Sequence, residues 1–323
     1  DFHMPLTLCV PCVFGRRPDQ LMPQQTLLMI VNPRAGRNKS PAPLFDAAAI
    51  FCESGYLLSI HRTTAPGDAA AYAAREGGQY DVVVAVGGDG TLNEVACGLM
   101  QLQHPPLLGY LPQGSTNDFA ASLRISSNPA EAAQAIVRHQ PRMLDVGRWN
   151  QRHFIYVASF GAFTSTSYTA SQAAKNALGH FAYILEGMKD LNSLRPYRLR
   201  IQADGDTLDG EYLFGAVCNS TSIGGLMKLD PERVVLDDGR FELLLIRCPK
   251  TPAELQNLVL AMLEQRYDRD GVIFRHVRSL HLETEEDLPW SLDGEYAPSM
   301  PSVDITNCQQ ALTKLLRWAR WRI

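Results

Sequence analysis

Residues 86–95 read Val-Gly-Gly-Asp-Gly-Thr-Leu-Asn-Glu-Val, and this stretch decides the fold of the first half of the chain. The run 81–86 before it is apolar and β-branched, which is typical of a buried strand in a parallel sheet. After it, apolar residues recur at helical spacing from Leu92 to Leu99. The pattern predicts a strand, a glycine turn and a helix, and the N–H groups that open such a helix favour an anion such as a phosphate.

The aspartate in this turn, Asp89, needs its own explanation. A carboxylate beside a polyphosphate is repulsive unless a cation bridges the two, and the chain has no Walker-type lysine motif to supply positive charge. Mg²⁺ with oxygen ligands from protein and phosphates would supply it. The simpler alternative is an ordinary Asp-Gly turn that caps a helix.

Two further strand-turn segments have the same character. Residues 107–119 read Leu-Leu-Gly-Tyr-Leu-Pro-Gln-Gly-Ser-Thr-Asn-Asp-Phe, and 27–36 run from an apolar strand into Asn-Pro-Arg-Ala-Gly. Between them, 61–68 lead with two threonines into an alanine-rich helix, and their hydroxyls could face a ribose or phosphate. Because open α/β sheets bind nucleotides at the carboxyl ends of neighbouring strands, we expect these turns to meet in one site.

The order of these motifs resembles the diacylglycerol kinase catalytic family. N-P-x-A-G, T-x-x-x-D-A, V-G-G-D-G-T-L-N-E-V and P-x-G-S-T-N-D-F-A follow one another, and the likeness extends from about Thr26 onward. More narrowly, the chain is similar to the soluble bacterial lipid kinases of that family, which are relatives of the sphingosine kinases. NAD kinases and phosphofructokinases share the Gly-Gly-Asp-Gly element, but an NAD kinase would not be expected to carry Leu92-Asn93-Glu94 and then Gly-Ser-Thr-Asn-Asp-Phe.

The resemblance implies an ATP site in the first domain, with Mg²⁺ held by Asp89. The family usually has Thr where this chain has Ser115, and a hydroxyl remains there. The residues implied to hold ATP are Asn32, Thr64, Gly87, Gly88, Asp89, Gly90, Thr91, Leu92, Asn93, Gly114, Ser115 and Asn117.

From Arg142 onward, short strands alternate with Gly, Asp and Asn turns, which favours a β-sandwich-like domain. We expect a hairpin over 142–158 and further strands at 197–202, 211–217, 241–246, 272–282 and 302–305. Two helices interrupt them, one at about 178–191 and one that opens with the capping box Thr251-Pro252-Ala253-Glu254. The expected fold class is therefore α/β plus all-β: a three-layer α/β nucleotide-binding domain like those of NAD kinases and diacylglycerol kinases, followed by a β-sandwich-like domain.

The second half contains the candidate base. In the resembled family the segment that matches Leu292-Asp293-Gly294-Glu295 carries the catalytic carboxylate, which implies that Glu295 is a general base and that Asp293 assists through metal. The alternative for an isolated Asp-Gly is a hairpin turn with solvated acids.

The resemblance also implies a second, structural Mg²⁺. Its ligands would be the side chain of Asp238 and the backbone carbonyls of Val235 and Arg240, a chemically sound set for a hard cation. The alternative is a simple turn before the strand at 241–246. From its position, the segment Asn219–Gly225 is expected to border the acceptor pocket.

Composition agrees with two globular domains. The chain has 323 residues, 46% hydrophobic and 20% charged, and we divide it into a tail at 1–25, the α/β domain at 26–141 joined by 309–323, and the β-rich domain at 142–308. A net charge of −4 and no recognisable motif argue against a nucleic-acid partner. Seven scattered cysteines and no run of 18 apolar residues favour a cytoplasmic protein that visits the membrane surface transiently.

Together these features predict an ATP-dependent lipid kinase that uses Mg²⁺. It would transfer the γ-phosphate to a primary hydroxyl of a lipid such as diacylglycerol; monoacylglycerol, phosphatidylglycerol, ceramide and sphingoid bases offer the same group. An NAD kinase and a catalytically silent lipid- or nucleotide-binding regulator on the same fold remain the alternatives. The basic and aromatic end from Leu312 is expected to pack on the first domain as a helix, with contact to a membrane as the other possibility.

Overall fold

The computed structural model describes residues 24–36, 42–115, 117–138, 141–161, 195–223, 227–229, 234–264, 266–267 and 269–314. The chain divides into two compact units, 1–143 with 312–323 and 144–311. The expected helix at 178–191, most of the N-terminal tail and the end of the chain after Lys314 lie outside the described residues.

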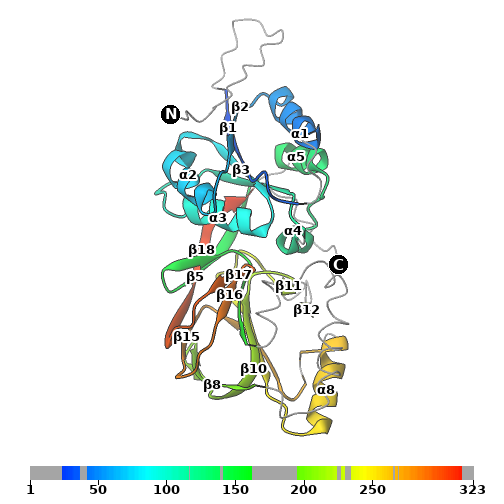
Figure 1. Cartoon of the computed structure of the whole chain (residues 1–323), viewed down its shortest axis with the longest axis vertical. Coiled ribbons are helices and arrows are strands. Elements are labelled where there is room, and N and C mark those ends of the chain that lie inside the picture. The colour runs from blue at the N-terminus through cyan, green and yellow to red at the C-terminus, as the bar shows by residue number, and fades with distance from the viewer. Residues whose placement is uncertain are drawn as a thin grey trace, which may run out of the picture. The chain divides into compact units, whose positions relative to one another are not determined.

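The first unit alternates strands and helices (Figure 1). Its elements are β1 (Thr26–Val31), α1 (Ala42–Glu53), β2 (Leu57–Arg62), α2 (Asp68–Glu76), the 3₁₀ helix η1 (Gly77–Gln79), β3 (Val82–Gly87), α3 (Asp89–Leu99), β4 (Leu107–Pro112), α4 (Asp118–Ser122) and α5 (Pro129–Arg138).

A parallel sheet in the order β2-β1-β3-β4 forms the centre of this unit. Every residue of β3 is buried, as expected for a strand with helices over both of its faces. Helices α2 and α3 lie on one side of the sheet, and α1 and α5 lie on the other (Figure 1). The strands are all parallel, but β2 is added on one side of β1 and β3 on the other, so the order of strand addition switches sides at β1. The carboxyl ends of the strands at such a switch point are the expected place for a ligand.

The second unit is built mainly of antiparallel strands. Its described elements are β5 (Arg142–Trp149), β6 (Arg152–Phe154), β7 (Val157–Gly161), β8 (Tyr197–Ala203), β9 (Asp206–Thr207), β10 (Gly210–Cys218), β11 (Ser222–Ile223), β12 (Met227–Lys228), β13 (Phe241–Arg247), α8 (Pro252–Leu263), β14 (Val272–Val277), β15 (Ser279–Glu283), β16 (Trp290–Leu292), β17 (Glu295–Ala297) and β18 (Ser302–Lys314).

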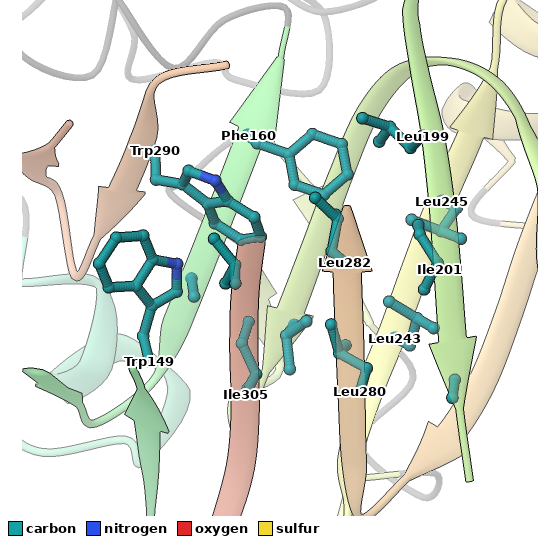
Figure 2. Packing of buried hydrophobic residues seen from close by; sticks show 14 of the residues in the cluster. Trp149, Phe160, Leu199, Ile201, Leu243, Leu245, Leu280, Leu282, Trp290 and Ile305 are labelled. Carbon is teal, nitrogen blue, oxygen red and sulfur yellow. The ribbon is translucent and has the colours of Figure 1, made fainter. Parts of the chain in front are cut away.

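Two strand layers enclose the core of this unit. One layer runs β17-β16-β7-β10-β13-β14, and the other contains β8, β15, β18, β5 and β6. Side chains from both layers interdigitate between them, and Figure 2 shows Leu243 and Leu245 beside Leu280 and Leu282. This arrangement confirms the predicted combination of an α/β domain and a β-sandwich-like domain.

Three local predictions concern where strands and helices begin and end. The run 272–282 is two strands, because β14 pairs with β13 whereas β15 turns to pair with β8 and β18. The strand expected at 302–305 continues to Lys314, whose register partner is Leu108 of β4, so the helix expected from Leu312 was wrong for Leu312–Lys314. The N-cap at Thr251 is confirmed: the Thr251 hydroxyl accepts the N–H of Glu254 at 3.2 Å, and Oε2 of Glu254 accepts the N–H of Lys250 at 2.8 Å.

Two expectations drawn from composition also bear on the described residues. Within them, no helix has the length and apolar character needed to cross a membrane. Among the described residues, the free thiols are those of Cys52, Cys97, Cys218, Cys248 and Cys308.

Candidate active site

Two glycine turns of the first unit touch through their backbones. A methyl group at Gly114 would lie 2.5 Å from the Cα of Gly88, so only hydrogen fits between the turns. The N–H of Gln113 donates to the carbonyl of Gly87 at 2.7 Å. The two motifs that the sequence placed at neighbouring strand ends are therefore joined into one backbone surface at the start of α3.

Asp89, the first residue of α3, links this surface to a second helix. Its Oδ2 accepts the N–H of Asp118 at 2.8 Å and its Oδ1 accepts the N–H of Phe119 at 3.3 Å. The carboxylate thus binds the N-terminus of α4, where helix N–H groups lack intrahelical partners. Burial raises the pKa of Asp89 to about 6, and the nearby charge of Asp118 adds to the rise.

The carboxylate oxygens at this helix start suit a cation that also binds phosphate. Burial raises the pKa of Asp118 to about 6 as well, and the charge of Asp118 contributes to the raised pKa of Asp89, so two carboxyl groups lie close together at this helix start. Within the ranges that the structure describes, no group of three His, Cys, Asp or Glu side chains could hold a metal ion. One or two carboxylates with substrate phosphates is the usual Mg²⁺ arrangement, and Asp89 fits that role.

Two asparagines of the predicted site hold the turns in shape. The amide of Asn32 donates to the Thr91 hydroxyl at 3.1 Å, which ties the end of β1 to α3. Asn117 has a positive φ of 52°, and its Oδ1 accepts the N–H of Gly114 at 2.8 Å. Asn32, Thr91, Gly114 and Asn117 therefore lie together with the two glycine turns.

Thr64 lies in the loop between β2 and α2, and this loop is hydrogen-bonded to Glu94 of α3. The backbone N–H and the hydroxyl of Thr64 donate to Oδ2 of Asp68 at 2.8 and 3.1 Å. The N–H of Gly67 donates to Oε1 of Glu94 at 3.0 Å. Sequence reasoning did not include Asp68 or Glu94 as site residues, although an aspartate at the start of a helix is a usable signal for a loop-closing bond.

The other predicted ATP residues differ in what their side chains can reach. Leu92 is 1% exposed and packs in the core, so only its backbone could meet a nucleotide. The side chain of Asn93 accepts a hydrogen bond from the Cys97 thiol at 3.5 Å. Ser115 is exposed at the second glycine turn.

In the second unit, Asp293 and Gly294 form the tip of the hairpin between β16 and β17. Leu292 and Glu295 are paired across it, and Glu295 is exposed at the start of β17. Asp293 is 3% exposed, and its carboxylate accepts the backbone N–H groups of Ile155, Tyr156 and Val157 at 2.6, 3.0 and 2.9 Å.

The turn that was predicted to hold a structural metal is hydrogen-bonded to Asp145, an aspartate that the sequence analysis did not single out. Oδ1 of Asp238 accepts the N–H of Arg240 at 2.9 Å, and Oδ2 of Asp145 accepts the N–H of Gly239 at 2.7 Å. Burial raises the pKa of Asp145, and the charge of Asp238 raises it further. Asp238 is the acidic side chain of the turn itself, and with the Val235 and Arg240 carbonyls it makes a candidate ligand set for a hard cation, while Asp145 of β5 adds a second negative charge nearby.

Asn219 begins the segment Asn219–Gly225 that was expected to border the acceptor pocket. It is fully buried, its backbone N–H donates to the Tyr156 carbonyl at 2.9 Å, and its amide donates to the Asp145 carbonyl at 2.9 Å. Gly224 and Gly225 lie outside the described residues.

Comparison with known protein families agrees with this geometry. Residues 26–149 match the Diacylglycerol kinase catalytic domain, and residues 157–316 match the YegS C-terminal NAD kinase beta sandwich-like domain. The chain is 34% identical over 276 residues to the diacylglycerol kinase of Bacillus subtilis (strain 168), a match that covers 84% of this chain and 90% of that one. It is also 34% identical to the diacylglycerol kinase of Staphylococcus aureus (strain MRSA252), over 85% of this chain and 87% of that one.

A solved structure shares the fold. A Bacillus anthracis str. Sterne protein proposed to be a diacylglycerol kinase superposes with a TM-score of 0.76 at 26% identity, covering 91% of this chain and 97% of that one. The motif order, the joined glycine turns and the two matched domains lead to one assignment. The chain belongs to the diacylglycerol kinase family and is a lipid kinase.

Proposed function

We propose that this protein transfers the γ-phosphate of ATP to a primary hydroxyl of a lipid, with diacylglycerol as the acceptor. The observation that carries the proposal is the contact between the turns at Gly88 and Gly114 at the start of α3. Backbone without side chains there lets phosphate oxygens approach the N–H groups of a helix start, as in other nucleotide sites.

Asp89 is the proposed metal ligand of the nucleotide site. When bound, Mg²⁺ would neutralise charge on the phosphates and on the transferring group. The raised pKa of Asp89 supports this role, because a buried carboxylate that is costly to charge gains most from a cation beside it.

Glu295 is the proposed general base. The lipid hydroxyl oxygen forms a bond to the γ-phosphorus, the bond from that phosphorus to the β–γ bridging oxygen breaks, and ADP leaves. The hydroxyl proton passes to the Glu295 carboxylate, which is exposed and can receive it. Positioning and charge stabilisation supply most of the rate enhancement in such a transfer.

Diacylglycerol is the proposed acceptor because the relatives with 34% identity are named diacylglycerol kinases. Its hydroxyl lies at the surface of a bilayer. We therefore include a peripheral, transient contact with the membrane in the proposal.

The test is transfer of labelled γ-phosphate from ATP, with Mg²⁺, to a panel of lipids in mixed micelles, with NAD and no-acceptor controls. Labelled phosphatidic acid as the main product would support the proposal. Label in another lipid would show that this lipid, and not diacylglycerol, is the acceptor. Label only in NADP would show that the protein is an NAD kinase. ATP binding without any transfer would favour a silent binding protein.

A further inference from the structure

The Asp293-Gly294 tip is a two-residue hairpin loop whose shape is tightly defined. Asp293 and Gly294 have positive φ angles of 50° and 87°, and Leu292 pairs with Glu295 across the loop. Positive φ at both central positions is the requirement of a type I′ turn, and Asp-Gly is one of the residue pairs that favour it. Glu295 is the first residue after the tip, so its backbone position follows directly from the geometry of this turn.

The Asp293 side chain attaches this tip to the neighbouring chain segment. Its carboxylate accepts three consecutive backbone N–H groups, from Ile155 to Val157, and its own N–H donates to the Val157 carbonyl at 2.8 Å. Hydrogen bonds from N–H groups to an ionised acceptor are among the stronger ones in proteins. Three such bonds in a 3% exposed site hold the tip of the hairpin against the start of β7.

The base of the hairpin and the segment that receives Asp293 are themselves anchored. Trp290, fully buried at the start of β16, packs edge-on against Phe160 with ring centroids 4.8 Å apart (Figure 2). The Tyr156 carbonyl accepts the N–H of the buried Asn219 at 2.9 Å. The hairpin that carries Glu295 is thus held at its base by aromatic packing and at its tip by the Asp293 carboxylate.

We propose that Asp293 is a positioning residue that acts through Glu295, by clamping the turn before it onto residues 155–157, and that it is not a metal ligand. This inference rests on the proposed function of Glu295 as the base. A base displaced by about 1 Å can cost about a hundredfold in rate, which is the scale of effect expected when the clamp is removed.

The same unit contains a matched control. Asp204 and Gly205 form another two-residue hairpin tip, between β8 and β9, with φ angles of 48° and 94°. The Asp204 carboxylate also accepts backbone N–H groups of a neighbouring segment, those of Arg278 and Ser279, at 2.8 and 2.9 Å. The two aspartates share the positive φ and the bonding of a carboxylate to backbone N–H groups, although Asp204 is exposed and accepts two such groups rather than three. Only Asp293 is followed by the proposed base.

The experiment compares Asp293→Asn with Asp204→Asn in the full chain. Asn tolerates positive φ, so both turns keep their conformation while each loses a charged acceptor. We expect Asp293→Asn to lower kcat by about 10²-fold with unchanged KM for ATP and unchanged half-saturation by Mg²⁺, and Asp204→Asn to leave kcat unchanged. The double variant Asp293→Asn/Glu295→Gln should be no slower than Glu295→Gln alone, since a positioning residue has nothing left to position.

Two results would contradict the positioning role of Asp293. A large rise in the Mg²⁺ half-saturation of Asp293→Asn would make Asp293 a metal ligand, and additive losses in the double variant would give it a role independent of Glu295. Either result would overturn the proposal.

A second measurement does not depend on kinase activity. Hydrogen exchange at the amides of 155–157 should speed up in Asp293→Gly, which keeps a residue able to adopt positive φ, and not in Asp204→Gly. Unchanged exchange at these amides in Asp293→Gly would overturn the clamp itself. Faster exchange in a protein that transfers no phosphate would retain the clamp and reject only the proposed function.

Discussion

Oδ2 of Asp89 accepts the backbone N–H of Asp118 at 2.8 Å, so one carboxylate opens α3 and binds the start of α4. The bond joins two motifs that are 29 residues apart in the chain. Asp89, the proposed metal ligand, therefore also holds the start of α4 in place. A test of its role must remove its negative charge while keeping its hydrogen bond to α4.

Asp89→Asn makes that separation. The amide keeps one acceptor for the start of α4 but loses the negative charge, so we expect the fold to remain and kcat/KM to fall about 10²–10³-fold, with a higher Mg²⁺ half-saturation. Mg²⁺ titrations of kinase activity check this, with the exposed Asp46→Asn of α1 as the control. An unchanged Mg²⁺ titration would remove Asp89 from the metal site.

Glu295→Gln tests the proposed base. Gln keeps the size of the side chain but cannot take the hydroxyl proton, so we expect activity to fall about 10²–10⁴-fold while ATP affinity is retained. Single-turnover phosphate transfer and ATP binding are measured on the same preparation, with the exposed Glu285→Gln as the control. Turnover close to the wild type in Glu295→Gln would exclude it as the base.

Gly114→Ala tests the contact between the two glycine turns. Its methyl group would lie 2.5 Å from the Cα of Gly88 and 2.6 Å from Oδ1 of Asn117, so the turns must separate. We expect a loss of about 1–3 kcal/mol in the free energy of unfolding and a raised KM for ATP.

The control for this variant is Gly78→Ala, because its methyl group would lie 3.8 Å from the side chain of Leu102, an ordinary contact. Denaturation curves and ATP titrations of both variants give the comparison. If Gly114→Ala matched Gly78→Ala in both measurements, the close approach would not shape the nucleotide site.

Local patterns were enough to predict the α/β unit. The apolar run before Gly87 and the helical spacing after Asp89 each depend on side chains a few residues apart, and the structure has β3 and α3 there. The clustering of Gly87, Gly114 and Asn117 followed from a general rule of parallel sheets rather than from any contact in the sequence.

The parts that were missed depend on partners far apart in the chain. Asp145 accepts the N–H of Gln310 at 2.7 Å, 165 residues away, and the segment that receives the Asp293 carboxylate begins 138 residues before it. No spacing rule connects such groups. The continuation of β18 to Lys314 was missed for the same reason, since its partner Leu108 belongs to another part of the sequence.

The last prediction concerns Glu242, a carboxyl group that the proposed mechanism does not use. It is 1% exposed on β13, and among the residues that the structure describes its Oε2 has no hydrogen-bond partner. Oε1 lies 3.9 Å from Nε2 of His276. Burial raises the pKa of Glu242 to about 9, and the charges of Asp238 and Asp145 add to the rise.

Because the folded-state pKa is above the usual value of 4.5, the folded protein binds the Glu242 proton more tightly than the unfolded chain does. This contribution to stability is complete below pH 4.5 and is lost as the pH rises toward about 9. Glu242→Gln cannot ionise, so we expect it to match the wild type near pH 5 and then to exceed the free energy of unfolding of the wild type by about 1.4 kcal/mol more for each pH unit up to about pH 8.5. Urea denaturation of metal-free protein across this range measures the difference, with Glu285→Gln as the control. A gap between Glu242→Gln and the wild type that did not widen with pH would show that the Glu242 carboxyl ionises as easily in the folded chain as in the unfolded one.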